Sequence, residues 1–321
     1  MPKSKTPAKR SRAKLEMPAS RQIKAPTYRS FRLSKRIKQP KPRLTGAFRL
    51  LWRSLKHLVK NWKVFGGIVF VYLVLTIVLV KGFGVSSNIG ELKTTFVGLF
   101  HGRTAGLSTG LTLFGVLLGN ANSTASDVAG AYQSMLLIII SLVLIWALRQ
   151  THATKKAKVT IRQSFYKGLH PTIPFLLVLI VIGLQIIPVL IANFLYTVVI
   201  GGGLAVTAIE KGLWFILIGL LVLLTLYLLT SSIFALYIVT LPDVTPMMAL
   251  RSARDLVRYR RWMIMRKLVF LPIALLVLAA VIVIPFIIIA PAVAEWLFFI
   301  LSMLTLAVVH SYMYSLYREL L

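Results

Sequence analysis

Six apolar runs dominate the hydropathy pattern of the chain. They cover about residues 64–80, 131–148, 171–199, 213–236, 267–290 and 296–314. The hydrocarbon core of a bilayer is about 30 Å thick, and an α-helix of about 20 apolar residues crosses it. Because backbone groups inside lipid must be paired within the protein, such segments are helices or closed barrels. The pattern therefore predicts an all-α class, a polytopic transmembrane bundle of six spans, as one membrane domain over residues 46–321.

Helical periodicity is clearest just before the first run. Over Gly46–Lys63, one face carries the apolar residues and the cations fall elsewhere. The apolar residues are Phe48, Leu51, Trp52, Leu55, Val59 and Trp62, and the cations are Arg49, Arg53, Lys56, Lys60 and Lys63. A helix with an apolar face, a basic face and tryptophans suits the membrane–water boundary. The segment is predicted to be an interfacial helix whose first four cations contact lipid headgroups.

A second basic stretch, within Asp243–Pro291, leads into the fifth run. Thr245 followed by Pro246 is a helix-start signal. In a continuous helix, one stripe would carry Arg251, Arg254, Arg258 and Arg261, and another would carry Leu250, Ala253 and Val257. We expect the apolar stripe to enter the acyl boundary and the guanidiniums to meet lipid phosphates. Alternatively, the arginines only fix the topology.

Positive charge is concentrated near the N-terminus. The 321 residues carry a formal net charge of +30, and residues 1–63 hold 20 lysines and arginines against one acid, Glu16. Residues 1–45 are rich in proline and poor in apolar residues, which predicts a disordered basic arm. The arm would keep the N-terminus in the cytoplasm and attract anionic lipid. Contact with a ribosome, nucleic acid or a protein partner stays open.

Loop charges predict the orientation of the spans. The arm and loops 149–170 and 242–267 are strongly basic, whereas loops 82–128, 200–212 and 291–295 carry few charges. Basic loops stay on the cytoplasmic side, so both termini are expected inside a bacterial-type cytoplasmic membrane. Within 82–128, Leu107–Leu118 is too short to cross and would be a surface helix or a re-entrant element. Tyr312, Tyr314 and Tyr317 are expected to form an aromatic belt at the inner end of the sixth span.

The third and fifth runs share a spacing of prolines. Pro174 and Pro188 align within one residue with Pro272 and Pro285. A basic stretch precedes each of these runs, as one precedes the first run. We infer three parallel hairpin units, each beginning on the inside with a basic amphipathic helix.

The C-terminal half resembles a known membrane domain. The run Met248–Arg258, the proline-containing span after it and the final Tyr317–Leu320 are similar to the membrane domain found with some bacterial glycerophosphodiester phosphodiesterases and with related integral membrane proteins. The resemblance covers about residues 150–321. It implies an inner-membrane bundle associated with lipid. The catalytic barrel of that family has no counterpart in this sequence, so no phosphodiesterase activity carries over.

Residues that could carry catalysis are sparse. The sequence has no cysteine, nucleotide-binding loop, metal-spaced histidine cluster or catalytic triad, so neither enzymatic activity nor a bound cofactor or metal is expected. Polar residues within the spans include Gln185, Asn193, Thr225 and His310. Such residues more often bond between helices than bind a solute, and His310 is expected at the interface.

The sequence thus predicts a non-enzymatic membrane protein that engages anionic lipids. It would organise lipids, a membrane partner or further copies of itself. One alternative is a small-solute transporter or channel with Gln185, Asn193, Thr225 and His310 along its pathway. Another is a tether that holds a ribosome or nucleic acid through residues 1–45.

Overall fold

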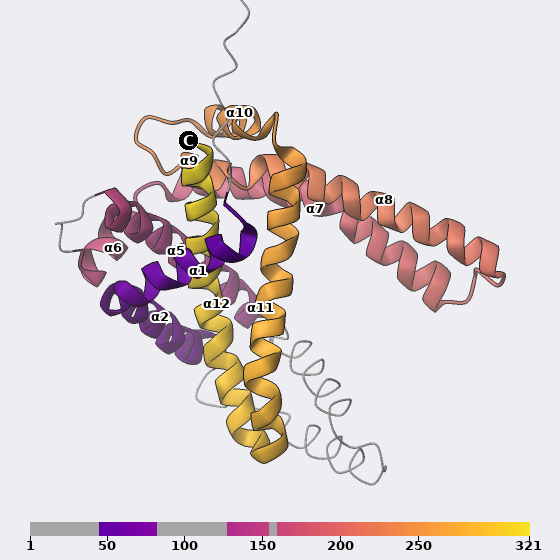
Figure 1. Ribbon diagram of the computed structural model, residues 1–321, viewed down its shortest axis with the longest axis horizontal. Helices are drawn as coiled ribbons and strands as arrows, with labels where there is room; N and C mark the ends of the chain where they lie inside the picture. The colour runs from indigo at the N-terminus through magenta and orange to yellow at the C-terminus, as the bar shows by residue number, and fades with distance from the viewer. Residues whose placement is uncertain (1–44, 82–126, 154–158) are drawn as a thin grey trace, which may run out of the picture. The chain divides into compact units, whose positions relative to one another are not determined.

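The computed structural model describes residues 45–81, 127–153 and 159–321, and these residues fold into α-helices with short connections inside each range (Figure 1). Leu107–Leu118 and all but the last residue of the predicted basic arm lie outside these ranges. The helices are α1 (Ala47–Lys60), α2 (Trp62–Thr76), α5 (Asp127–Ala153), α6 (Ile161–Gly168), α7 (Thr172–Leu195), α8 (Ala208–Ser232), α9 (Ala235–Ile238), α10 (Pro246–Val257), α11 (Arg261–Ile289) and α12 (Pro291–Leu320). The π-helical turns η1 (Ile77–Lys81) and η2 (Tyr196–Gly201) follow α2 and α7.

Six helical segments in the described part of the chain are long and apolar enough to cross a membrane. They cover Trp62–Val80, Val128–Ala153, Thr172–Gly201, Ala208–Ile238, Arg261–Ile287 and Trp296–Leu320. The all-α class and the six apolar runs are therefore confirmed. The predicted end of the sixth span, Tyr314, falls short, because the last turns of α12 stay helical as far as Leu320. These turns are polar and aromatic, and tertiary packing stabilises them.

Threonine side chains define the starts of three helices. The hydroxyls of Thr160, Thr207 and Thr245 each accept the backbone N–H three residues on, at the starts of α6, α8 and α10. Pro246 lies in the first turn of α10, where its missing N–H breaks no helical hydrogen bond. The predicted start at Thr245 and Pro246 is therefore confirmed.

The amphipathic helix predicted over Gly46–Lys63 is interrupted. The chain turns at Asn61, whose side-chain amide donates to the carbonyl of His57 at 3.1 Å, and α2 starts at Trp62. The backbone N–H of Asn61 donates to the same carbonyl at 3.2 Å, so backbone and side chain of Asn61 together cap the end of α1. The turn separates α1 from α2, so each can take its own direction.

The main hydrophobic core lies where α1, α2, α5 and the C-terminal half of α12 meet. In the membrane-crossing windows of α5 and α12, 44% and 39% of the residues are buried, against 17% in α7 and 6% in α8. α7 and α8 pack on each other (Figure 1) and expose most of their remaining surface. Close packing is thus concentrated on α5 and α12.

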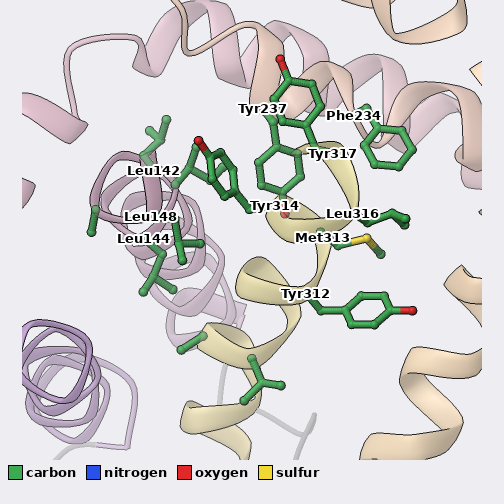
Figure 2. Packing of buried hydrophobic residues seen from close by; sticks show 14 of the residues in the cluster. Leu142, Leu144, Leu148, Phe234, Tyr237, Tyr312, Met313, Tyr314, Leu316 and Tyr317 are labelled. Carbon is green, nitrogen blue, oxygen red and sulfur yellow. The ribbon is translucent and has the colours of Figure 1, made fainter. Parts of the chain in front are cut away.

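The tyrosines of α12 belong to this core and do not form the predicted aromatic belt. Tyr312 is fully buried, and Tyr314 and Tyr317 are nearly so. Figure 2 shows Tyr237 of α9 beside the last two, with ring centroids 6.2 Å apart in both pairs. Arg149 of α5 donates to the carbonyl of Tyr237 at 3.2 Å and to that of Thr240 at 2.7 Å. These contacts fasten the end of α9 to α5 and α12.

Candidate membrane-interface site

Helix α1 has three faces, not the two that the sequence predicts. The buried face consists of Leu50, Leu51, Ser54 and Leu58, the exposed apolar face of Phe48, Trp52 and Val59, and the exposed basic face of Arg49, Arg53, Lys56 and Lys60. Phe48, Trp52 and Val59 are 72%, 66% and 70% exposed. At 3.6 residues per turn, the centres of the three faces lie roughly 90–145° apart. One side of α1 therefore contacts protein, and two sides of different chemistry remain exposed.

Polar contacts fix the buried face of α1 to the C-terminal end of α12. The hydroxyl of Ser311 donates to the carbonyl of Ser54 at 3.2 Å. The Glu319 carboxylate accepts a hydrogen bond from the Thr45 hydroxyl and lies 3.6 Å from Nη1 of Arg53. It also lies 3.6 Å from Nζ of Lys267, the nearly fully buried ammonium of α11. Glu319 thus joins three helices and determines the rotation of α1 about its axis.

Helix α10 buries the apolar stripe that was expected to enter lipid. Ala253 and Val257 of this stripe have no exposed surface, Leu250 is partly buried against the same core, and the neighbouring Ala249 is fully buried; α10 packs on α8, α9 and α7. The small side chains of the two alanines allow that close approach. This part of the prediction is wrong: α10 contacts protein along the stripe, and only its other side, with Arg251 and Arg254, is exposed.

The predicted four-arginine stripe is also interrupted. α10 ends at Val257 and α11 begins at Arg261, so Arg261 does not continue the line of Arg251 and Arg254. Instead, the Arg261 guanidinium lies 4.6 Å from the ring centroid of Tyr227 on α8, within the range of a cation–π contact. Arg258, in the turn, lies 5.8 Å from the ring of Tyr259. Helical spacing failed here because the helix turns at residues 258–260.

A pair of histidines lies beside α1, where sequence reasoning placed no site. The rings of His57 on α1 and His152 on α5 stack, with centroids 3.9 Å apart and an interplanar angle of 27°. Nδ1 of His152 donates to the Leu148 carbonyl at 2.9 Å. Nε2 of His57 lies 3.1 Å from the Thr151 hydroxyl oxygen. The Thr151 hydroxyl donates to its own helix, and the side-chain amide of Asn61 lies 3.5 Å from the same ring nitrogen of His57.

The surroundings of His57 disfavour its charged form. Burial lowers the pKa of His57 to about 4, and the positive charges of His152, Arg318 and Lys60 add to this effect. The ring is therefore neutral near pH 7. For His152 the nitrogen that can take up a further proton is Nε2, because Nδ1 already carries a proton and donates it to the Leu148 carbonyl.

The four residues of the alternative solute pathway have separate environments. Thr225 is buried, and its hydroxyl donates to the Leu221 carbonyl of its own helix at 3.0 Å. Asn193 is exposed on α7, whereas Oε1 of Gln185 on the same helix is buried without a hydrogen-bond partner. His310 is buried against Tyr237, 3.1 Å from its hydroxyl. The His310 side chain thus faces the protein interior, and the expectation that it lies at the depth of the membrane interface stays a prediction.

The described residues contain no group of three or more histidine, aspartate or glutamate side chains that could hold a metal ion. Comparison with known proteins yields no match: no protein-family model, curated protein or solved structure is similar to the chain. The resemblance of residues 150–321 to a phosphodiesterase-associated membrane domain stays a prediction.

Proposed function

We propose that the protein is a non-enzymatic, multi-pass protein of a bacterial-type cytoplasmic membrane that engages anionic lipid headgroups and thereby organises lipids or a membrane partner. The observation that carries this proposal is the three-faced α1. One face is fixed to α12, one exposes Phe48, Trp52 and Val59, and one exposes four cations. A helix lying in the boundary needs these three surroundings: protein at its side, acyl chains below and phosphates with water above.

Magnitudes favour membrane contact over exposure to water. Burying a large apolar side chain stabilises by about 1.5–3 kcal/mol, so partial insertion of three such residues is worth on the order of 5 kcal/mol. Each cation near an anionic surface adds about 1 kcal/mol. The apolar term retains α1 in any bilayer. The electrostatic term depends on lipid charge and falls with salt, so it is what selects anionic lipid.

The orientation belongs to the same proposal. α2 packs on α5, α7 on α8 and α11 on α12, and each pair follows a basic helix: α1, α6 or α10. If all three basic helices lie on the cytoplasmic side, both termini are inside. The exposed Arg251 and Arg254 of α10 then add to the cationic surface. Their contribution is smaller than that of α1, because α10 turns its apolar stripe toward protein.

A small-solute pathway is the second candidate function. One observation favours it: Oε1 of Gln185 is buried on a membrane-crossing helix without a partner. An acceptor oxygen in that position would suit a solute that donates hydrogen bonds. The proposed tether to a ribosome or nucleic acid depends on residues 1–44, which lie outside the described residues.

The experiment is a lipid-selection assay on the full chain. The protein is reconstituted into nanodiscs of phosphatidylcholine with a minor share of phosphatidylglycerol, and the lipid enriched around it is quantified by mass spectrometry. Replacing both cations in R49Q/K56Q should reduce phosphatidylglycerol enrichment about thirtyfold, because each contributes about 1 kcal/mol. The charge-preserving R49K/K56R is the matched control and should keep the enrichment. Equal enrichment in all three proteins would refute the proposal.

A further inference from the structure

The histidine corner, defined as His57, Lys60, His152 and Arg318, lies where three helices that can cross a membrane have their ends. Lys60 is two residues before the first crossing segment begins at Trp62, His152 is one residue from the end of the second at Ala153, and Arg318 is two residues from the end of the sixth. A crossing segment ends where the hydrocarbon gives way to headgroups. The corner is therefore at the depth of lipid phosphates.

Among the described residues, the charges that act on the corner are all positive. Those on His57 come from His152 of α5, Arg318 of α12 and Lys60 of α1. Among the other neighbouring elements, α12 adds the Tyr314 ring, 5.2 Å from that of His152, and α2 adds Phe65, which does not titrate. α11 contributes Lys267, which is paired with Glu319. Glu319 is paired with Arg53 and Lys267. Its negative charge therefore compensates those two cations, at the contact between α1, α11 and α12.

Hydrogen bonds fix the two histidine rings of the corner. Thr151 and the Leu148 carbonyl fix the two rings through one nitrogen each. The second nitrogen of each ring becomes a donor on protonation. Imidazolium and guanidinium donors bind phosphate oxygens with short, charge-assisted hydrogen bonds. A phosphate would also remove the mutual repulsion of the cluster.

We propose that the histidine corner binds the phosphate of one anionic lipid headgroup and that His57 takes up a proton when the phosphate binds. The inference rests on the proposed function, because an engaged membrane lipid is what supplies a phosphate at this depth; a free phosphate ion offers the same chemistry. Without the anion, the pKa of His57 is about 4, and a neighbouring negative charge raises the pKa of a histidine. Binding therefore favours proton uptake, and the affinity increases as the pH falls below neutral.

The test uses the nanodisc assay at about pH 8 and about pH 5.5, values that bracket the ordinary histidine pKa. Phosphatidylglycerol is a phosphodiester and keeps one negative charge in this range, so any pH dependence comes from the protein. The wild type should bind one phosphatidylglycerol in preference, with about tenfold higher affinity at the lower pH. R318Q, at an exposed position, should lose about tenfold in affinity at both pH values, and R318K should recover part of it. H57Q should remove the pH dependence.

Two controls separate the outcomes. H170Q changes an exposed histidine outside the corner and should behave like the wild type. Adding inorganic phosphate identifies the source: displacement of the lipid shows that the corner accepts free phosphate, and no displacement shows a lipid site. If R49Q/K56Q loses enrichment while R318Q and H57Q match the wild type, the corner is refuted and the proposed function stands. If no variant changes enrichment, both fail.

Discussion

Glu319 offers the sharpest test of how α1 is held, because E319Q removes its charge and keeps its shape. The carboxylate lies 3.6 Å from Nζ of Lys267, and only 5% of the Lys267 side chain is exposed. Removing one partner of a buried ion pair costs about 3–5 kcal/mol, since the other charge stays buried without compensation. The second pair, with Arg53, adds less than about 1 kcal/mol, because 62% of the Arg53 side chain is exposed. The amide oxygen can still accept the Thr45 hydrogen bond. We therefore expect E319Q to lower the free energy of unfolding by about 3 kcal/mol.

The assay is reversible unfolding of the purified protein by sodium dodecyl sulfate, followed by tryptophan fluorescence. A double-mutant cycle of E319Q, K267M and K267M/E319Q isolates the pair. The double variant removes both charges and should recover most of the stability, because no buried charge is then left without its partner. D255N, at an exposed carboxylate on α10, is the control for losing one negative charge and should stay within about 0.5 kcal/mol. A loss below about 1 kcal/mol in E319Q, or no recovery in the double variant, would refute the reasoning.

Three further outcomes are expected. Because the sequence has no cysteine, a spin label on a single introduced cysteine reports one position. A label at W52C should be accessible to oxygen, one at K56C to a water-soluble nickel complex, and one at S54C to neither. Access of the nickel complex to W52C would contradict the lipid-facing assignment. R261Q should lower the free energy of unfolding by about 0.5–1 kcal/mol, because it removes the contact with Tyr227. R254Q, at an exposed position on α10, should leave that free energy almost unchanged. Equal losses in the two variants would count against the contact. The pKa of His57 is lowered from 6.5 to about 4 in the folded protein. As the pH falls, His57 of the unfolded chain is therefore protonated before His57 of the folded chain. Its contribution to stability is present above about pH 6.5 and is lost as the pH falls toward 4; a wild-type decline over this range that matches that of H57Q would contradict the shift.

The parts of the fold that the sequence predicted are those set by local composition. Spans such as Trp62–Val80 could be found because length and hydropathy belong to a single segment. The cap at Thr245 could be found for the same reason. Helix ends near polar residues were less predictable. α12 continues to Leu320 because Tyr312 and Tyr317 pack against other helices, which hydropathy cannot register.

The surroundings of an apolar face could not be predicted from its periodicity. Both α1 and α10 have apolar stripes at helical spacing, yet Trp52 is exposed while Ala253 is fully buried. The signal that could have separated them is side-chain size. Alanines let helices approach closely, whereas tryptophan is typical of the membrane boundary. Long-range pairs such as Arg149 with Thr240 cannot be predicted from a single sequence.

The histidine corner illustrates the same limit and connects the two halves of the proposal. His57 and His152 stand far apart in the sequence, and neither is part of a recognisable motif, yet their rings stack in the fold. Under the proposed function, the exposed apolar face of α1 would fix the depth of the helix in any bilayer, whatever the lipid charge. With α1 at that depth, the corner would lie at the phosphates, where a proton on His57 and the guanidinium of Arg318 could act on the same anion. Lipid charge and pH would then regulate one contact, while the hydrophobic faces keep the protein in place under both conditions.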